Sequence, residues 1–229
     1  MKSSSEASKK AWDNAYKTGK YKEAQALAFT ETIVEFIQKK LPKKSKGLYV
    51  GCGNGRNFVP LVRRGLDLDG VDISGVGINE IRNRLPGYSG SLNVGDFRDI
   101  QGQTWDYLIS LQVFQHGSSN ELNSFYASSA RLLKNSGYLF LRVNASTTQL
   151  DLGHVILEGE KNKSRTVKYT EGHKAVGEVL IHFYDKDELL QLANDNGFKV
   201  TQPPLEDRTY RETPRGGFWS QWETIWQKA

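Results

Sequence analysis

The feature that most constrains this chain is a glycine-rich loop that directly follows an apolar run. The run, KGLYV at 46–50, has the length of a buried strand, and Gly51, Gly53 and Gly55 come next. Glycine turns tightly and lets the backbone approach a ligand, because it has no side chain. A strand that ends in such a loop and continues into a helix is typical of open α/β sheets, which bind ligands at the carboxyl ends of their strands.

The rest of the chain repeats this alternation of strand and helix. It predicts right-handed crossovers and an α/β fold: a Rossmann-like, mostly parallel sheet with helices on both faces. The segment at 105–116 is too apolar to be anything but a central strand. The last two strands are expected to form an antiparallel hairpin at one edge. Strands are expected at 46–50, 66–74, 90–96, 105–116, 138–144, 198–205 and 218–229, and helices at 26–41, 56–65, 75–87, 120–137 and 185–197.

Polar residues are expected to punctuate these elements. Asn120 and Asp185 stand where two helices begin, and their side chains are suited to N-caps. Gly197 is expected to end the second of these helices. Residues 145–180 are polar and interrupt the alternation.

Size and composition limit the class of protein. The 229 residues fit one α/β domain, so 1–229 is treated as a single domain. The single cysteine, Cys52, excludes an internal disulfide and a metal site built from cysteines, so we expect no metal and a cytoplasmic location. No apolar stretch approaches the ~20 residues of a membrane span, and the first residues lack the apolar core of a signal peptide. The formal charge of +5 permits an anionic partner without indicating one.

The loop itself leaves several ligands open. A nucleoside triphosphate loop needs Lys and Ser or Thr after its last glycine, whereas Arg56 and Asn57 follow here. A dinucleotide loop spaces its glycines G-x-G-x-x-G, whereas Gly55 comes one place early. Close approach of the backbone to a ligand is all that the loop by itself predicts.

Acidic residues at the ends of the next two strands narrow the choice. Asp72 ends the second strand, where a carboxylate can accept both hydroxyls of a ribose. Asp96 ends the third strand and can accept from an exocyclic amine, with Phe97 beside it to cover an aromatic ring. A ligand that carries a ribose and a base is therefore expected.

In this order, the motifs resemble those of the class I S-adenosylmethionine-dependent methyltransferases of the small-molecule type. YVGCGNGRN resembles their glycine-rich motif, GVDIS their acidic ribose motif and GDFRDI their adenine motif. WDYLISLQVFQH resembles their fourth-strand motif, and ARLLKNSGYLFLRV the helix and strand that follow. The resemblance is close over residues 45–145.

This resemblance implies a seven-stranded sheet whose last strand runs antiparallel between its neighbours. It implies S-adenosylmethionine as cofactor and S-adenosylhomocysteine as product. The glycine-rich loop would lie against the methionine part of the cofactor, and the sulfonium end would meet the fourth strand. The cofactor-binding residues that it implies are Gly51, Cys52, Gly53, Gly55 and Asn57, then Asp72 for the ribose, Ile73, Asp96 and Phe97 for the adenine, Leu111 and Gln112 for the sulfonium end, and Trp12 and Tyr16 from the N-terminal segment.

The N-terminal segment and the loop leave two questions open. Residues 1–20 are aromatic enough either to fold over the cofactor as a lid, as in several members of the family, or to pack on the core. The family usually has an acidic residue two places before the first glycine, and Tyr49 stands there in this chain. Support for the cofactor amine must then come from elsewhere, or the loop must be held differently.

The expected reaction moves a methyl group to an oxygen or nitrogen of a small-molecule acceptor. An in-line displacement mainly needs a nucleophile held close and aligned, and a general base only if the nucleophile arrives protonated. His116 is the first candidate for that base, and the further candidates are His154, His173, His182 and Tyr184. Residues 145–183 occupy the place of the family's substrate-recognition insertion.

Three alternatives stay open. The first is an RNA or protein methyltransferase, although no broad basic or stacking surface is evident. The second is a dehydrogenase, and the third is a sensor that binds the nucleotide and catalyses nothing. We expect no membrane partner and no nucleic acid. The oligomeric state is expected to be a monomer or a homodimer.

Overall fold

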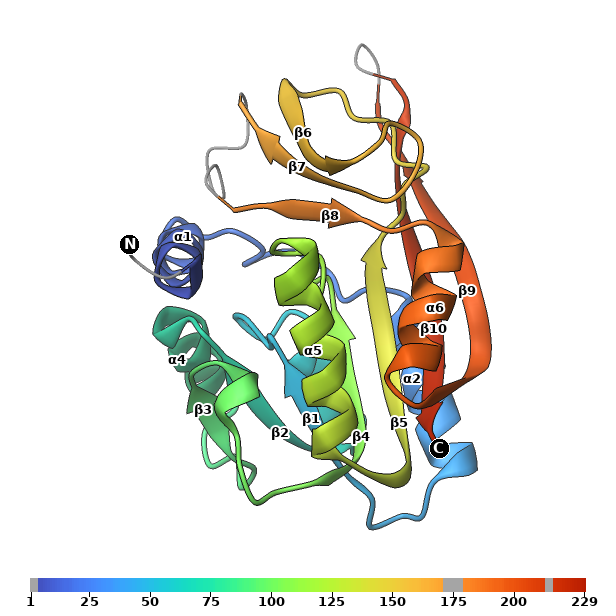
Figure 1. Ribbon diagram of the computed structural model, residues 1–229. Coiled ribbons are helices and arrows are strands. Elements are labelled where there is room, and N and C mark those ends of the chain that lie inside the picture. Colours follow the sequence, from blue (N-terminus) through green and yellow to red (C-terminus); the bar gives the residue numbers. More distant parts are fainter. Residues whose placement is uncertain (1–3, 171–178, 213–215) are drawn as a thin grey trace.

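The computed structural model describes residues 4–170, 179–212 and 216–229, and its centre is a seven-stranded sheet (Figure 1). The strand order is β3-β2-β1-β4-β5-β10-β9. This confirms the predicted sheet, because β10 lies between β5 and β9 and runs antiparallel to both. The strands are β1 (Lys46–Val50), β2 (Asp67–Asp72), β3 (Leu92–Val94), β4 (Trp105–Leu111), β5 (Leu133–Asn144), β9 (Phe198–Tyr210) and β10 (Phe218–Lys228).

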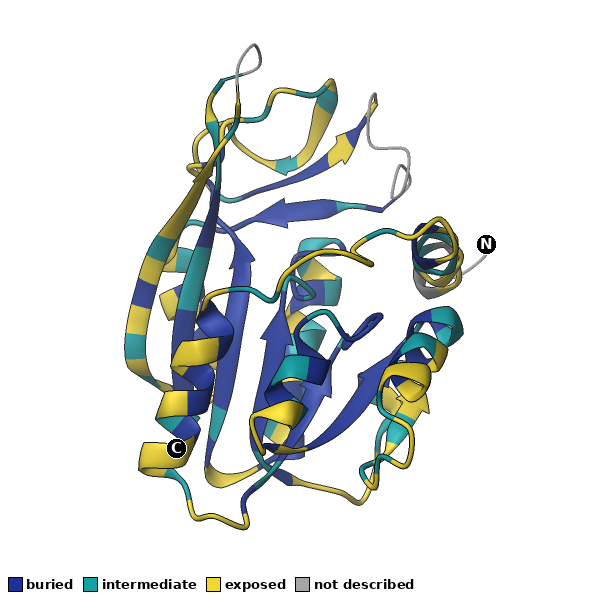
Figure 2. Ribbon diagram, turned by 180° about the vertical axis from the view of Figure 1, so that it is seen from behind, coloured by how far each residue is buried: buried dark blue, intermediate teal, exposed yellow. Residues whose placement is uncertain are grey.

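The apolar segment that predicted a central strand forms β4, which pairs in parallel with β1 and β5. Strand β1 in turn pairs in parallel with β2, with Tyr49 opposite Gly70. The middle of the sheet is buried on both faces, whereas the outer surfaces of the helices are exposed (Figure 2). All the parallel strands therefore end at one edge, beside the glycine loop.

Two hydrophobic clusters cover the two faces of the sheet. One face holds α5 and α6, which pack Leu122, Tyr126 and Leu189 against the sheet. The other holds α2, α3 and α4, with Ile33 and Phe58 among the buried side chains. The helices of these layers are α2 (Phe29–Lys40), α3 (Phe58–Arg63), α4 (Gly75–Arg84), α5 (Ser119–Leu132) and α6 (Lys186–Asp195), and a short 3-10 helix, η1 (Phe97–Asp99), follows β3.

The caps of two helices test the sequence signals directly. Asp185 caps α6 as predicted, because its side chain accepts from the backbone N–H of Glu188 at 2.8 Å. Asn120 is not the cap of α5. Ser118 is the cap, and it forms a reciprocal capping box with Glu121. Ser118 is favoured over Asn120 as the N-cap because the capping box satisfies two backbone donors, whereas a single capping side chain satisfies one.

A second, three-stranded antiparallel sheet was not predicted. It comprises β6 (His154–Gly159), β7 (Arg165–Tyr169) and β8 (Ile181–Phe183), in the segment expected only to interrupt the alternation. Isolated bridges join it to the rest of the fold at His116 with Ile181 and at Ala145 with Tyr184. It stands above the carboxyl ends of the parallel strands (Figure 1), and we call it the cap sheet.

Helix α1 (Ser4–Lys17) packs on α4 (Figure 1). Asp13 fixes it there, because its Oδ1 accepts from Ser74 Oγ at 2.6 Å and from the backbone N–H of Val76 at 3.3 Å. Among the described helices, none has the length and hydropathy to cross a membrane.

Candidate active site

One cavity of about 730 Å³ lies at the carboxyl ends of the parallel strands, between the main sheet, α1 and the cap sheet. We name two parts of it. The glycine-loop half is lined by α1 and by the segments that follow β1, β2, β3 and β4. The cap half is lined by the ends of β5 and β10, by the cap sheet and by Gln115, and the side chain of Gln112 reaches it from the segment after β4. Side chains of the cap half are Gln115, Arg142, Asn144, Tyr169, Phe183, Trp219 and Gln221.

The glycine loop is shaped so that its backbone faces the cavity. Gly51 has a φ of +67°, and a Cβ there would lie 2.3 Å from a methyl group of Val113. Gly53 has a φ of +54°, and a Cβ there would lie 2.4 Å from the hydroxyl of Tyr16. Both positions require glycine for conformation and for space. Cys52 and Asn57 also line the cavity.

The third glycine has a different place. Gly55 is not among the described residues that line the cavity, and its contact with the cofactor stays a prediction. Its φ is +85°, and a Cβ there would lie 2.7 Å from Val59 and 2.9 Å from Ile81. Gly55 therefore lets α3 and α4 pack closely behind the loop.

Asp72 is buried at the end of β2 and holds the glycine loop. Its Oδ2 accepts from the backbone N–H of Gly53 at 2.7 Å, and its Oδ1 accepts from that of Ser74 at 2.8 Å. The pKa of Asp72 is raised to about 6, mainly by burial and also by the nearby charge of Asp13, against the effect of the two hydrogen bonds. Each carboxylate oxygen keeps a second lone pair, so the group can still accept two hydroxyls.

The segment after β3 brings Asp96 and Phe97 to the cavity, where Ile73 also lies. The carboxylate of Asp96 is held by Arg98, whose Nε lies 3.0 Å from Oδ1 and 2.9 Å from Oδ2. Phe97 stacks on Phe114, with ring centroids 5.5 Å apart. Sequence reasoning missed Arg98, although it stands within the motif GDFRDI.

After β4, the chain turns sharply at Gln112, whose φ of +63° is rare outside glycine. The turn is held by a bond of 2.7 Å from its backbone N–H to the carbonyl of Arg142. Its side-chain Nε2 reaches Gln221 Oε1 at 3.1 Å. Leu111 and Gln112 both line the cavity, as predicted. The strained backbone aims this side chain across the cavity toward β10.

Helix α1 brings two more predicted residues to the cavity. Trp12 stacks with Tyr16, with ring centroids 5.7 Å apart, and meets the ring of His116 edge-on at 5.4 Å. Trp12, Tyr16 and His116 all line the cavity. The helix therefore joins the glycine loop to the segment after β4, and its role as a lid stays a prediction.

Carboxamides dominate the polar surface of the cap half. Gln112 donates to Gln221, which donates through Nε2 to Asn144 Oδ1 at 3.3 Å. Gln115 Oε1 accepts from the backbone N–H of Asn144 at 2.9 Å. Trp219 lies on the same side of β10 as Gln221, with the guanidinium of Arg211 4.4 Å from its ring centroid.

The one charged side chain on the cap-half list, Arg142, is already paired. It binds Asp207 at 2.7 Å and also Glu223, and its side chain is only 6% exposed. Burial raises the pKa of Glu223, although Arg142 acts in the opposite direction. Within the described residues, the Nε of Arg142 is buried without a partner. The guanidinium of Arg165 in β7 donates to the carbonyls of Ser146 and Thr148.

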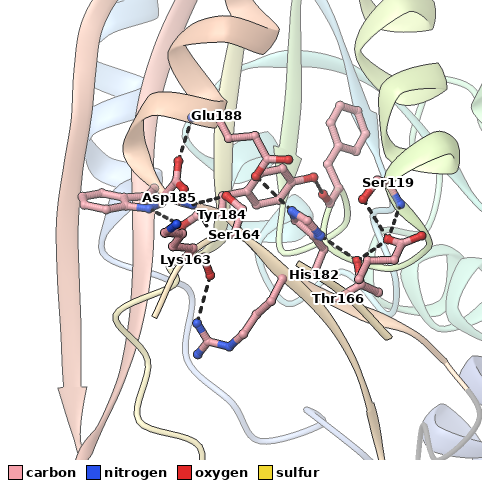
Figure 3. A network of polar contacts seen from close by, with 12 residues as sticks. Ser119, Lys163, Ser164, Thr166, His182, Tyr184, Asp185 and Glu188 are labelled. Atoms are coloured by element: carbon pink, nitrogen blue, oxygen red, sulfur yellow. Dashed lines mark hydrogen bonds and ion pairs between the residues drawn. The ribbon is translucent and has the colours of Figure 1, made fainter. Parts of the chain in front are cut away.

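The other candidate bases lie away from the cavity or outside the described residues. His182 is buried, with Nδ1 2.8 Å from Thr166 Oγ1 and Nε2 3.0 Å from Glu188 Oε2 (Figure 3). The hydroxyl of Tyr184 donates to the carbonyl of Phe114, and the ring of His154 lies against the carbonyl of Leu152. His173 lies outside the described residues. His116 is therefore the only predicted base, within the described chain, that lines the cavity.

His182 belongs instead to a network that ties the cap sheet to the helices (Figure 3). Glu158 of β6 accepts from the hydroxyls of Ser119 at 2.8 Å and Thr166 at 2.7 Å. Thr166 contacts His182, which continues to Glu188 of α6. This network fixes the cap sheet above the site.

Comparisons with known proteins indicate a methyltransferase. Residues 48–137 match the family model described as a methyltransferase domain. No curated protein matches this chain. A solved structure of an S-adenosylmethionine-dependent methyltransferase from Methanosarcina mazei is 19% identical, with a TM-score of 0.64, over 84% of this chain and 96% of that one.

Two further solved structures contain a bound cofactor, and one of them also contains its substrate. CalS10, an amino pentose methyltransferase from Micromonospora echinaspora solved with its methyl donor, is 17% identical, with a TM-score of 0.61, over 94% of this chain and 97% of that one. The 1,6-didemethyltoxoflavin-N1-methyltransferase of Burkholderia thailandensis is 16% identical, with a TM-score of 0.61, over 88% of this chain and 79% of that one. At these identities, the structures show that the fold is shared.

Residues 48–137 match a methyltransferase domain, and the chain has the Rossmann-like fold of S-adenosylmethionine-dependent methyltransferases. Both findings agree with the family resemblance, the enzyme class and the cofactor that the sequence predicts. The residues present fit that cofactor. Gly51 and Gly53 line the cavity with backbone alone, and Asp72 keeps two acceptor positions beside them.

Proposed function

We propose that this protein transfers a methyl group from S-adenosylmethionine to an oxygen or nitrogen of a small-molecule acceptor. The observation that carries the proposal is the single cavity of about 730 Å³, which joins the glycine-loop half to the cap half beneath α1 and the cap sheet. Small-molecule sites commonly measure about 300–1,000 Å³. An RNA or protein acceptor would need a more open surface.

In this proposal, the glycine-loop half holds the cofactor. Asp72 accepts from the ribose hydroxyls, and Gly51 and Gly53 present their backbone to the methionine part. Asp96, Phe97 and Ile73 bind the adenine, with Arg98 fixing the carboxylate of Asp96. Leu111 and Gln112 face the sulfonium end. When bound, the cofactor supplies an electrophilic methyl carbon, and the chain's residues hold the acceptor in line with it.

The cap half then binds the acceptor, in agreement with the proposed role of residues 145–183 in substrate recognition. Its carboxamides offer donors and acceptors without net charge, and Trp219 offers an aromatic face. The structural relatives named above act on an amino pentose and on 1,6-didemethyltoxoflavin, which are small polar rings. A polar, ring-shaped acceptor would suit the same surface.

His116 is proposed as the base that takes the proton from an acceptor hydroxyl or amine. It lines the cavity beside Trp12, between the two halves. His116→Ala should lower kcat about 100-fold with an acceptor that must lose a proton, while the affinity for S-adenosylhomocysteine changes less than about threefold. Full activity of the variant would remove the role. His154→Ala is the matched control.

Thermal unfolding with S-adenosylhomocysteine, NAD and NADP separately is the first test of the proposal. At a hundred times its dissociation constant, a ligand that binds only the folded state adds about 2.7 kcal/mol. A rise in Tm with S-adenosylhomocysteine alone is expected. A rise with NAD or NADP alone would contradict the proposal and favour a dehydrogenase.

A methyl-transfer screen with small molecules, RNA and protein substrates then separates the remaining alternatives. Turnover of a small molecule is expected. Turnover of RNA or protein alone would replace the acceptor class, and binding of the cofactor without turnover in any pool would favour a sensor. The cytoplasmic location and the oligomeric state, a monomer or a homodimer, stay predictions from the sequence.

A further inference from the structure

Tyr49 stands where the methyltransferase family usually has an acidic residue, and its side chain is a buried, neutral phenol. Its side chain is 2% exposed, and its hydroxyl is hydrogen-bonded to Asn57. Burial raises the pKa of this hydroxyl, so it stays neutral. The position therefore supplies no negative charge to an ammonium group in the cavity.

The described carboxylates that do line the cavity have other partners. Asp72 accepts from two backbone N–H groups, and Asp96 is held by Arg98. Glu121 belongs to the capping box of α5. None of these three replaces the acid that is missing at Tyr49.

Two cations lie near the glycine loop instead, and both line the cavity. The backbone carbonyl of Lys20 accepts from Asn54 Nδ2 in the loop at 3.3 Å. Arg56 follows the loop, and its Nε donates to the carbonyl of Gln25 at 2.7 Å. In the part of the chain that the structure describes, neither side chain forms an ion pair with a carboxylate.

The two cations lie against the same aromatic ring. The Nζ of Lys20 lies 5.1 Å from the ring centroid of Tyr21, and the guanidinium of Arg56 lies 5.4 Å from it. Tyr21 has a φ of +62°, which is rare outside glycine, so the turn that holds this arrangement is strained. Partial burial lowers the pKa of Lys20, because the ammonium has lost water without gaining an anion.

A bound anion that pairs with these two groups would relieve that cost. Charge-assisted bonds from Lys and Arg to a carboxylate are short and strong, and a guanidinium is shaped to grip both oxygens. The amino-acid end of the proposed cofactor carries one carboxylate and one ammonium. The charges beside the loop match the carboxylate, whereas Tyr49 offers nothing to the ammonium.

We propose that Lys20 and Arg56 form a carboxylate subsite that anchors the amino-acid end of the cofactor, in place of the usual acid that anchors its ammonium. This inference rests on the proposed function, because it assigns the orientation of the same ligand. It makes the carboxylate of the cofactor more important for affinity than its amine.

Isothermal titration calorimetry with three ligands tests this on the unmodified protein. The ligands are S-adenosylhomocysteine, its analogue with hydrogen in place of the carboxylate, and its analogue with hydrogen in place of the amine. Loss of the carboxylate should weaken binding about tenfold or more, and loss of the amine less than about threefold. A larger loss from removal of the amine would overturn the subsite.

Variants assign the effect to residues. Lys20→Met should weaken S-adenosylhomocysteine about tenfold and leave the analogue without the carboxylate within about twofold. Arg56→Gln should follow the same pattern. Lys17→Met, which removes an equal charge from an exposed position on α1 outside the cavity, should change neither affinity.

The outcomes separate the subsite from the function on which it rests. Equal weakening of both ligands by Lys20→Met and by Arg56→Gln would mean that the two cations only support Tyr21 and the loop, and would overturn the subsite. Absence of binding by S-adenosylhomocysteine to the unmodified protein would overturn the cofactor assignment itself. If one variant fails to fold, the ligand series on the unmodified protein still decides between carboxylate and amine.

Discussion

The two halves of the cavity are assembled in different ways. In the glycine-loop half, contacts join segments that follow neighbouring strands, such as Gly53 and Asp72, which are 19 residues apart. In the cap half, Gln112 meets Gln221 across 109 residues, and Arg142 meets Glu223 across 81. The first half is built from local motifs, and the second depends on the return of the chain along β10.

Their charges differ as well. Lys20, Arg56 and Asp72 lie in the glycine-loop half without opposite charges paired to them among the described residues. In the cap half, Arg142 is neutralised by two acidic side chains, and the other polar groups are mainly carboxamides. The contrast suits a charged, fixed ligand on one side and a polar ligand without a required charge on the other.

The largest expected effect is a loss of stability from a substitution in the cap half. Arg142→Met should lower the free energy of unfolding by about 3 kcal/mol, because it leaves the partly buried Glu223 without its partner. Affinity for S-adenosylhomocysteine should change less than about twofold, since the side chain belongs to the other half. Urea denaturation and calorimetry measure the two quantities.

A second substitution checks the cause of that loss. Glu223→Gln in the Arg142→Met background should recover part of the stability, because it removes the uncompensated buried charge. A decrease of less than about 1 kcal/mol in Arg142→Met would mean that the ion cluster does not hold the hairpin to β5.

The next effect breaks the glycine-loop half. Asp72→Asn should weaken S-adenosylhomocysteine about tenfold, or 1.4 kcal/mol, because an amide offers one acceptor atom where the carboxylate offers two. The amide also loses one of the two hydrogen bonds that Asp72 accepts from the backbone N–H groups of Gly53 and Ser74, so the Tm of the free variant is measured beside its affinity. Unchanged affinity in calorimetry would remove Asp72 from the ribose site.

The smallest effect concerns the pH at which that half binds. The pKa of Asp72 in the folded protein, about 6, lies above its ordinary value of 3.8. In the free protein, stability from this group is therefore present below pH 3.8 and lost as the pH rises through about 6. Binding has the opposite sign, because ribose hydroxyls need the ionised carboxylate, so affinity for S-adenosylhomocysteine should fall as the pH falls through about 6.

Asp13→Asn sharpens this prediction. It removes the neighbouring charge that raises the pKa of Asp72, while an amide oxygen can still accept from Ser74 and Val76. The midpoint of the binding profile should move to lower pH, by a few tenths of a unit to about one unit. Calorimetric titrations over a pH series measure it, and an unmoved midpoint would contradict the assignment of the titration to Asp72.

The sequence by itself determined the fold class and most of the glycine-loop half. Alternating strands and helices imply a parallel sheet, and the carboxyl ends of such strands meet at one edge. Asp72, Asp96 and Gln112 could therefore be placed together from their positions at strand ends. Gly55 was the exception, since its neighbours Val59 and Ile81 meet only when α3 packs beside α4.

Only the tertiary structure decided the cap half. The cap sheet lies in a polar segment without a clear strand period, and its contacts with α5 and α6 run through Glu158 and His182. Trp219 and Gln221 alternate along a strand as packed side chains do, and they line the cavity because β10 begins there. The physical reason is that a local motif predicts the backbone turn at the end of a strand. A contact between side chains 109 residues apart, such as that of Gln112 with Gln221, depends on strand register, which no local pattern encodes.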